Sequence, residues 1–595
     1  MWRASLLAGL WLARGMAAVP AAPPTDAAPG IAFSHLEARL AARSQTGNAT
    51  TNPAGFTDYS PEGFAASMAY QRGILAELHA IDRAALPHAA QVTYDAIEWD
   101  AERILDRETA PWLQFPYTPY EFLFHGPNRV LTDFRFRADQ DVRAYLALTS
   151  QYPAALDSMV RFIEAQMRQG IYVQRDVAAS LRRQFAALAT APAESFAYPG
   201  AARIAALSPA ARQRLQRDLQ SLIAGRINPA LRRLSDRFDE TYQAAAPRRY
   251  GMAQYPGGKA YYKVLMRYWL TLDLTPEEAF RRSQDALDRI ESDLQELRAE
   301  MGVAGNRRDF EERLAHDPAF IAKTPADVEK TYLGYMARID PLLPRLFCRA
   351  APYGYGVQRA SPAAEAALTF GFAGVQTEPE RRGMYYYNGS NLGQRSLLPA
   401  QALIYHELAP GHYWQEAMAF TSAQLTAYPR RSNAYSESWG DFAQLLAYEQ
   451  GVFRTPQEKY GRRLFNAMFH ARALADIGVN YFGYDFEWGL AVLRRYTFES
   501  DLQNRSSLSR DTTDWPAQIL PYSFGSEALL RLREKARGAL GERFSAPRFY
   551  DAVLSVGAVA LPVLERQVDW FIENEKNGSA PGICVADGRR HESDR

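Results

Sequence analysis

The stretch from Leu398 to Gln415 reads LPAQALIYHELAPGHYWQ and places His406, Glu407 and His412 within seven residues. Two neutral imidazoles beside a carboxylate are the set that a zinc hydrolase uses as metal ligands and general base. In the usual H-E-x-x-H pattern, four residues advance a helix by about 400°, so both His lie on one face. The stretch therefore predicts a metal site within an otherwise apolar helix.

The spacing between the two His departs from that pattern. Six residues advance about 600°, which would hold His406 and His412 roughly 120° apart on a regular helix. Pro410 lacks the N–H that would bond the carbonyl of His406, and Gly411 permits the dihedral angles that a break requires. We interpret the segment as H-E-x-x-H with a two-residue bulge. Two structural core histidines are the alternative, and the chain contains nine His.

A candidate third ligand follows in the next helical segment, Ser436–Leu446. Its apolar residues recur at helical spacing, which indicates that one face is buried. Glu437 lies near the start of this helix, and Asp441 lies one turn further along the same face as a fallback ligand. The alternative is an acidic residue that complements the helix dipole, which is common at this position.

Composition excludes several classes of protein. The chain of 595 residues is 47% hydrophobic and 12% aromatic, enough for a sizeable core. A net charge of +1 provides no basic excess for binding nucleic acid. No apolar run reaches the roughly 18 residues of a membrane span. We expect one large folded body and no nucleic-acid partner.

The N-terminus resembles a secretory signal in its charge and apolar pattern. Arg3 supplies the positive region, Ala4–Ala13 the apolar core, and small residues follow at a possible cleavage site. We expect residues 1–22 to be a signal peptide, 23–30 a linker, and the mature protein to be periplasmic or secreted. A short N-terminal membrane anchor is the alternative.

Helical periodicity dominates the rest of the chain and never gives way to sustained alternation. Thr275 followed by Pro276 and two acidic residues is a typical helix start. The one convincing strand is Met384–Asn388. We expect it to be an edge strand near the site whose backbone, around Tyr386 and Asn388, binds an extended substrate. A purely structural strand explains these residues equally well.

Further motifs extend this pattern over most of the chain. They are GGKAYYKVLMRYWLTLDLTPEE at 257–278, Glu-Ser-Trp at 437–439, RALADIG at 472–478 and PAQILPY at 516–522. With the His-Glu motif, they resemble the bacterial family of unknown function DUF885, over residues 31–575. We associate that family with zinc metallopeptidases of the thimet oligopeptidase and Taq-type carboxypeptidase kind.

The resemblance implies a mostly α fold: a large two-lobed helical body with a deep central cleft and at most a small β-sheet at the active site. The lobes would span about 31–245 and 246–575, followed by a tail at 576–595. It implies one zinc ion at the cleft floor and a peptide as substrate.

The resemblance also implies roles for individual residues. His406, His412 and Glu437 correspond to metal ligands and Glu407 to the catalytic base. The remaining carried-over residues line the cleft, with Arg472 and Tyr522 as catalytic groups and Gln518 as a substrate contact. Arg472 and Asp476 are four residues apart, so they can pair on one helix face.

Four positions depart from the family's usual residues. Tyr413 and Asn480 stand where His is usual, and Glu-Ser-Trp-Gly stands at 437–440 where Glu-Gly-Trp-Ala is usual. A lost His that served as ligand or proton donor would impair the site or alter its specificity.

The sequence thus predicts an exported zinc metallopeptidase in which Glu407 is the general base. The first alternative is a catalytically weak or inactive relative that binds peptides outside the cytoplasm. A serine hydrolase is a weaker alternative, because the chain lacks a G-x-S-x-G elbow.

The two cysteines, Cys348 and Cys584, are the only ones in the chain. In an exported protein they permit one disulfide that joins the C-terminal tail to the middle of the chain. Two free, buried thiols are the alternative.

Overall fold

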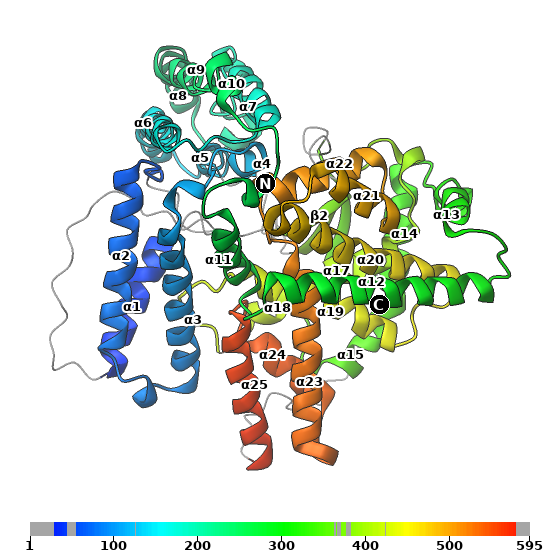
Figure 1. The fold of residues 1–595 in the computed structure, drawn as a ribbon. Helices are drawn as coiled ribbons and strands as arrows, with labels where there is room; N and C mark the ends of the chain where they lie inside the picture. Colours follow the sequence, from blue (N-terminus) through cyan, green and yellow to red (C-terminus); the bar gives the residue numbers. More distant parts are fainter. Residues whose placement is uncertain are drawn as a thin grey trace.

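The computed structural model describes residues 29–44, 55–124, 126–361, 365, 370–376, 382–422 and 424–578. The predicted signal peptide and linker fall almost wholly outside these ranges. The described chain is mostly α-helical, as predicted (Figure 1). Its first helices are α1 (Pro29–Ser44), α2 (Pro61–His79), α3 (His88–Leu105), α4 (Pro119–Phe124), α5 (Pro127–Thr132), α6 (Gln140–Arg168), α7 (Arg175–Leu188), α8 (Pro209–Leu222), α9 (Asn228–Asp236) and α10 (Glu240–Ala245).

The later helices surround the segment that carries the predicted metal ligands. They are α11 (Gly258–Leu270), α12 (Pro276–Glu300), α13 (Arg307–Ala315), α14 (Pro325–Ile339), α15 (Leu343–Leu346), α17 (Ala400–Glu407), α18 (His412–Phe420), α19 (Asn433–Glu449), α20 (Pro456–Ile477), α21 (Phe486–Tyr496), α22 (Asp501–Ser509), α23 (Ser526–Leu540), α24 (Ala546–Ser555) and α25 (Leu561–Lys576).

Side-chain caps explain where several of these helices begin. Thr275 accepts a hydrogen bond from the backbone N–H of Glu278 at 3.1 Å, and Pro276 occupies the first helical position of α12. Thr455 and Glu458 form a reciprocal capping box at the start of α20. Helix α12 then packs along α20 (Figure 1).

Buried apolar residues gather in three clusters. The largest combines side chains of α1–α3 with side chains from Met252 to Ile572, and it surrounds α17–α19. A second cluster runs from Tyr117 to Ala246 and lies among α5–α10. A third fills the space between α12, α20 and α21. The division into two lobes near residue 245 stays a prediction.

The described strands form one small sheet, in agreement with the expectation of little β structure. Its strands are β1 (Tyr355–Arg359), β2 (Gly371–Gln376) and β3 (Arg382–Tyr387), in the order β1-β3-β2. Strand β1 pairs parallel with β3, and β2 pairs antiparallel with β3.

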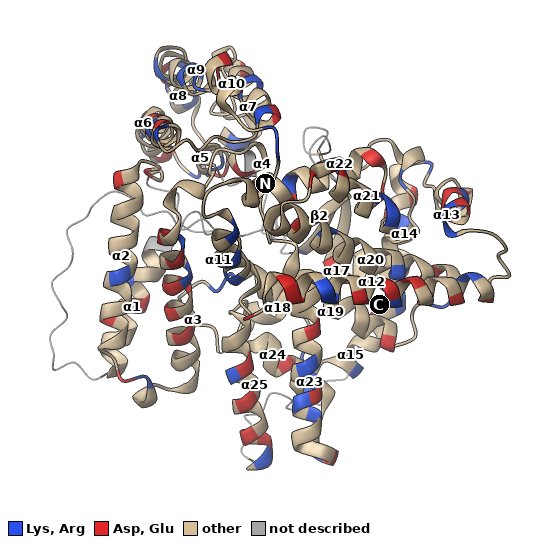
Figure 2. Cartoon of the chain, viewed as in Figure 1, with Lys and Arg blue, Asp and Glu red and all other residues tan. Residues whose placement is uncertain are grey.

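Charged residues of both signs are interspersed along the helices, for example on α23 and α25 (Figure 2). Among the described residues, no helix combines the length and apolar composition needed to cross a bilayer. Cys348 takes part in a disulfide, so the alternative of a free thiol at this position is wrong. Its predicted partner, Cys584, lies outside the described residues.

Candidate metal centre

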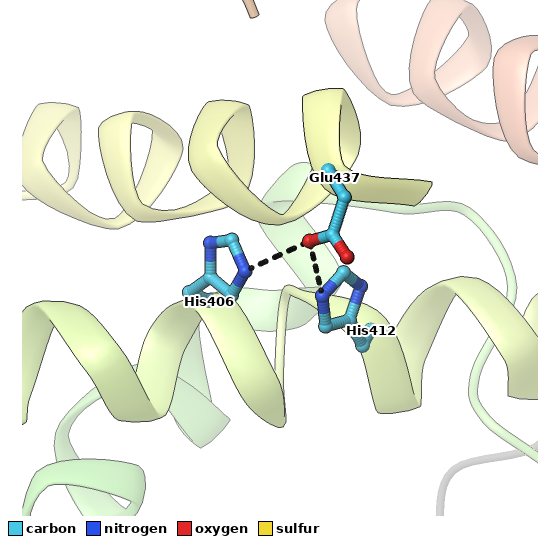
Figure 3. A group of neighbouring side chains, drawn as sticks. All are labelled: His406, His412 and Glu437. Atoms are coloured by element: carbon cyan, nitrogen blue, oxygen red, sulfur yellow. Dashed lines mark ion pairs between the residues drawn. The ribbon is translucent and has the colours of Figure 1, made fainter. Parts of the chain in front are cut away.

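His406, His412 and Glu437 come together as one buried group of possible metal ligands, as predicted (Figure 3). The Nε2 atoms of His406 and His412 lie 3.5 and 3.3 Å from Oε2 of Glu437. One ligand atom from each residue lies within 4.8 Å of the others. The Nδ1 atoms of both rings are buried without a hydrogen-bond partner. Two imidazole nitrogens and one carboxylate oxygen fit a divalent metal ion.

The break between α17 and α18 brings the two imidazoles together. Helix α17 ends at Glu407 and α18 begins at His412, with a cis peptide between Ala409 and Pro410. The predicted break at Pro410-Gly411 is present, but it separates two helices rather than forming a two-residue bulge within one, because the helix is interrupted from 408 to 411. A Cβ at Gly411 would lie 1.9 Å from the carbonyl oxygen of His406, so only glycine fits this close approach.

Helix α19 supplies Glu437 and holds the break in place. Its Trp439 donates an indole hydrogen bond to the carbonyl of Pro410 at 2.9 Å. Nearly all of α19 is buried, so the helix runs through the core next to the two imidazoles. Glu437 is 2% exposed and itself occupies the position of the third ligand. The fallback ligand Asp441 bonds Gln444 and Asn466 instead.

The other carboxylate oxygen of Glu437, Oε1, accepts a hydrogen bond from the protein. Asn433 donates to Oε1 of Glu437 at 3.4 Å, and Gln518 donates to Oδ1 of Asn433 at 3.2 Å. Gln518, predicted as a substrate contact, is therefore bonded to the residue that orients Glu437. Sequence reasoning missed Asn433, although its place four residues before Glu437 on one helix was a usable signal.

The three ligand side chains perturb one another strongly. Burial lowers the pKa of His406 to about 4. Burial also disfavours charge on His412, but the contact with Glu437 outweighs it and raises the pKa of His412 to about 9. Burial alone would raise the pKa of Glu437, yet hydrogen bonds with its two His partners lower this pKa to about 2. Without a metal, the group therefore holds one proton on His412 beside an ionised Glu437.

Glu407 lies on the wall of the same cavity as the ligands, as expected of a base. Its Oε2 accepts a hydrogen bond from the backbone N–H of Ala373, in β2, at 3.1 Å. Burial raises the pKa of Glu407 to about 7. A carboxylate with this pKa can accept a proton near neutrality.

The sheet contradicts the predicted role of Met384–Asn388. Strand β3 is the central strand, so its backbone is already paired on both sides and cannot receive a substrate as an edge. Tyr386 stacks on Phe372, and Asn388 donates to the carbonyl of Glu365 at 2.9 Å. Neither residue is part of the cavity wall. We therefore withdraw Tyr386 and Asn388 as substrate contacts.

Strand β2 provides the edge that faces the ligands. Its pairing with β3 includes a bond from Asn388 to the carbonyl of Phe370, so alternate residues from Phe370 point their backbone groups toward β3. Gly371 and Ala373 consequently point theirs away from β3, in agreement with the bond from Ala373 to Glu407. The run GFAGVQ lacks the aromatic density that made β3 conspicuous in the sequence.

The cavity over the ligands has about 960 Å³ of space not filled by protein atoms. Tyr522 lies on its wall, with its ring parallel to that of His406 at 5.9 Å and to that of Phe469 at 4.5 Å. Burial raises the pKa of Tyr522 well above its usual value, so the phenol stays neutral and can donate a hydrogen bond.

Arg472 also lines the cavity, but its predicted ion pair is wrong. It pairs with Asp511 through two hydrogen bonds of 2.7 and 3.0 Å, rather than with Asp476. Asp476 instead accepts hydrogen bonds from the backbone of Ala517, from Tyr262 and from Asn480. The guanidinium therefore reaches the cavity already neutralised.

The departures from the family's usual residues leave the ligand set intact. Tyr413 points away from the ligands and donates to the carbonyl of Tyr353. Asn480 donates to Asp476 and to the carbonyl of Asp511, behind Arg472. Gly440 adjoins the ring of His406, and a Cβ there would lie 2.7–2.9 Å from three ring atoms. An alanine at 440 would require a shifted imidazole.

Two solved structures resemble the chain in fold. The described fold is similar to a crystal structure described as "the putative lipoprotein from Colwellia psychrerythraea", with TM-score 0.77 and 21% identity over 87% of this chain and 92% of the other. A structure described in the same terms, of unknown function, from Shewanella oneidensis has TM-score 0.65 and 16% identity over 90% and 96% of the two chains. At these identities the likeness concerns the fold.

No curated protein is detectably similar to the chain in sequence. A model of one protein family, in contrast, matches residues 42–568, from the last turn of α1 to α25. The match contains all three ligands, the break between α17 and α18, and the strand that contacts Glu407. The chain therefore belongs to the bacterial protein family of unknown function DUF885.

Proposed function

We propose that this protein is an exported zinc-dependent metallopeptidase. The observation that carries the proposal is the buried set of His406, His412 and Glu437, with Glu407 on the wall of the same cavity. Three protein ligands without cysteine leave room in the coordination sphere, which is the pattern of catalytic rather than structural zinc. Zinc bound there would act as a Lewis acid toward a substrate carbonyl and would promote the ionisation of water.

The residues of the chain supply the rest of the chemistry. Glu407 accepts a proton from the attacking water and donates it to the leaving amine, since its carboxyl titrates near neutrality. Tyr522 donates a hydrogen bond to the oxygen on which negative charge develops. Arg472, neutralised by Asp511, contributes to the shape of the cavity and positions neighbouring groups.

Strand β2 supports a peptide as the substrate. The backbone of Gly371 points away from β3 at the cavity wall. An extended peptide lying along this edge would gain main-chain hydrogen bonds that do not depend on its side chains. The edge would thus hold the scissile bond near the ligands and Glu407.

Export is supported by the N-terminal pattern of Arg3 and Ala4–Ala13, and by the description of the two similar structures as lipoproteins. N-terminal sequencing of protein recovered from outside the cytoplasm tests it. An intact Met1 on a cytoplasmic protein would contradict export.

The decisive experiment compares Glu407→Gln with wild type for metal content and peptide hydrolysis. The substitution keeps the shape of the side chain and removes its basicity, so bound zinc should stay stoichiometric while turnover falls by about 10²–10⁴-fold. Glu312→Gln, at an exposed position on α13, is the matched control and should behave as wild type. Zinc-loaded wild-type protein that cleaves no member of a peptide library would contradict the proposal.

A further inference from the structure

A second cavity lies beyond Trp515, which lines both it and the cavity over the metal ligands. It has about 600 Å³ of space not filled by protein atoms, a figure that includes space open to solvent. Four segments meet there: η2 (Asp106–Thr109), α4, α11 and η12 (Arg510–Asp514). The proposed hydrolytic chemistry makes no use of this cavity.

The walls of the second cavity are largely aromatic. Tyr261, Tyr268 and Trp269 come from α11, and Phe115 and Trp515 come from two other segments. The rings of Trp269 and Trp515 lie 6.2 Å apart. Such walls favour an apolar or aromatic body in the ligand.

Arg107 brings a buried cation to this cavity that takes part in no ion pair with the described residues. The residue is 8% exposed and its guanidinium lies 5.7 Å from the ring centre of Tyr268. It donates a hydrogen bond to Oε1 of Gln114. Glu121 is the carboxylate of this cavity that Arg107 influences electrostatically, from beyond the distance of an ion pair. A buried charge left unpaired is costly, so a complementary anion would stabilise it.

Glu121 brings a buried acid to the same cavity, and it interacts electrostatically with Arg107 without forming an ion pair. It is 5% exposed, and its Oε2 accepts the indole N–H of Trp515 at 2.7 Å. No arginine or lysine of the described residues pairs with it, and burial raises the pKa of its carboxyl to about 8. Its neighbour Asp514 is already engaged, because it accepts the backbone N–H groups of Tyr120 and Glu121 at the start of α4.

Two more polar atoms lack partners in the cavity wall. Nε2 of Gln114 and Oγ1 of Thr513 are buried without a hydrogen bond, on residues that are 7% and 4% exposed. Folded proteins rarely leave buried polar groups unpaired, so two such atoms in one cavity wall call for a functional explanation. Both side chains can donate to an anionic group beside Arg107.

We propose that this second cavity is a binding site for a free α-amino acid with an apolar or aromatic side chain. Its carboxylate is received by Arg107, Gln114 and Thr513, and its ammonium by Glu121. The side chain packs against the rings of α11 and Trp515. An acid and a cation that share one aromatic cavity without forming an ion pair match the two charges of a zwitterion, whereas the end of a longer peptide carries only one of them. The inference does not depend on a bound metal or on hydrolysis.

The first test uses full-length wild-type protein, treated with a chelator, in calorimetric titrations at neutral pH. L-Phenylalanine should bind saturably. N-acetyl-L-phenylalanine lacks the ammonium and L-phenylalaninamide lacks the carboxylate, so each should bind on the order of tenfold or more weakly. No binding of phenylalanine or leucine at millimolar concentration would overturn the proposal, as would equal binding of the blocked compounds.

Two variants assign the charges to residues. Glu121→Gln should weaken phenylalanine binding by roughly tenfold or more and leave N-acetyl-L-phenylalanine unaffected. Arg107→Met should weaken phenylalanine similarly and leave L-phenylalaninamide unaffected. Equal weakening of all three compounds would mean that the residues only support the fold, and would overturn the assignment. If a variant fails to fold, the wild-type ligand series decides alone.

Matched controls come from an exposed ion pair close in sequence. Arg72→Met and Glu108→Gln remove a 2.7 Å surface pair and should bind all three compounds as wild type does. Repeating the titrations with Glu407→Gln separates this site from the metal centre. Amino-acid binding that persists in an inactive protein would support this inference even if the proposed function fails.

Discussion

Asn433 is the residue through which the chain orients its carboxylate ligand, since it bonds the oxygen of Glu437 that faces away from the imidazoles. Partners of metal ligands typically contribute 10–100-fold to metal affinity. We therefore expect Asn433→Ala to bind zinc on the order of 10–100-fold more weakly while keeping one site per chain, as measured by competition with a chromophoric chelator.

The matched control for Asn433 is Asn306→Ala. Asn306 caps α13 through a 2.9 Å bond to the backbone of Asp309 and has no contact with the ligands. Its loss should lower the free energy of unfolding by about 1 kcal/mol and leave zinc affinity unchanged. Equal zinc affinity of Asn433→Ala and wild type would mean that the 3.4 Å contact does not orient Glu437.

His412 should release about one proton when a divalent metal binds. Its pKa of about 9 keeps it charged at pH 6.5 in the metal-free protein, and only a neutral imidazole can be a ligand. His406 and Glu437, with pKa values of about 4 and 2, are already in their binding forms. Metal affinity should therefore rise with pH until His412 is neutral without metal.

The proton count is measured with an indicator dye in weak buffer, in a Glu407→Gln background. That substitution removes the carboxyl whose pKa of about 7 would otherwise contribute. Binding without proton release at pH 6.5 would show that His412 is neutral in the metal-free protein, contrary to the effect we assign to Glu437.

Tyr413→His restores the family's usual residue at a position that faces away from the ligands. Tyr413 donates to the carbonyl of Tyr353, and a Cβ at Gly383 would lie 1.9 Å from its ring, so the side chain fills a close-packed site beside the sheet. We expect unchanged zinc stoichiometry and a modest loss of stability, measured by metal analysis and urea unfolding. A second equivalent of zinc in the variant would mean that residue 413 can reach the site.

At the scale of the element, the break between α17 and α18 replaces the usual spacing of a metal-binding helix. Gly411→Ala should displace His406 or the break itself, because its Cβ would lie 1.9 Å from a backbone oxygen. Backbone cannot move aside as a flexible side chain can, so we expect a loss of a few kcal/mol of stability, on the order seen for overpacking, together with weaker zinc binding.

Gly334→Ala provides the control for that break. Gly334 lies inside α14, and a Cβ there would meet no atom within 4 Å. The same chemical change should stabilise the protein by roughly 0.5–1 kcal/mol and leave zinc binding unaltered. If both glycine variants behave alike in urea unfolding and metal binding, the close approach at Gly411 is unimportant.

The order of the strands in the sheet could not be predicted from the sequence. The tyrosines of β3 indicated a strand, and a strand is present, but its central place depends on pairing with two strands that both precede it in sequence. Strand β2 contains two glycines and a single aromatic residue, so its composition gave little signal. The edge that faces Glu407 was therefore assigned to the wrong strand.

At the scale of the whole molecule, the features that could be predicted are those encoded locally. Helical periodicity and caps such as Thr275 act within a few residues, and the spacing of His406 and His412 signalled the metal ligands. The pair of Arg472 with Asp511 spans 39 residues and has no local signature. The prediction that Arg472 binds Asp476 failed because a favourable helical spacing does not force two buried groups to face each other.

The metal should stabilise the molecule as a whole, because its ligands come from three helices of the largest apolar cluster. The ligands on α17, α18 and α19 come together only in the folded chain, so zinc binds the folded chain far more tightly than the unfolded one. By mass action, free zinc at 100 times its dissociation constant adds about 2.7 kcal/mol to the free energy of unfolding. In scanning calorimetry, we expect zinc to raise the Tm of wild type and of Glu407→Gln equally. His412→Ala, which keeps the fold but loses one of three ligands, should show no zinc-dependent rise. A similar rise in His412→Ala would mean that zinc binds elsewhere and that the ligand assignment is wrong.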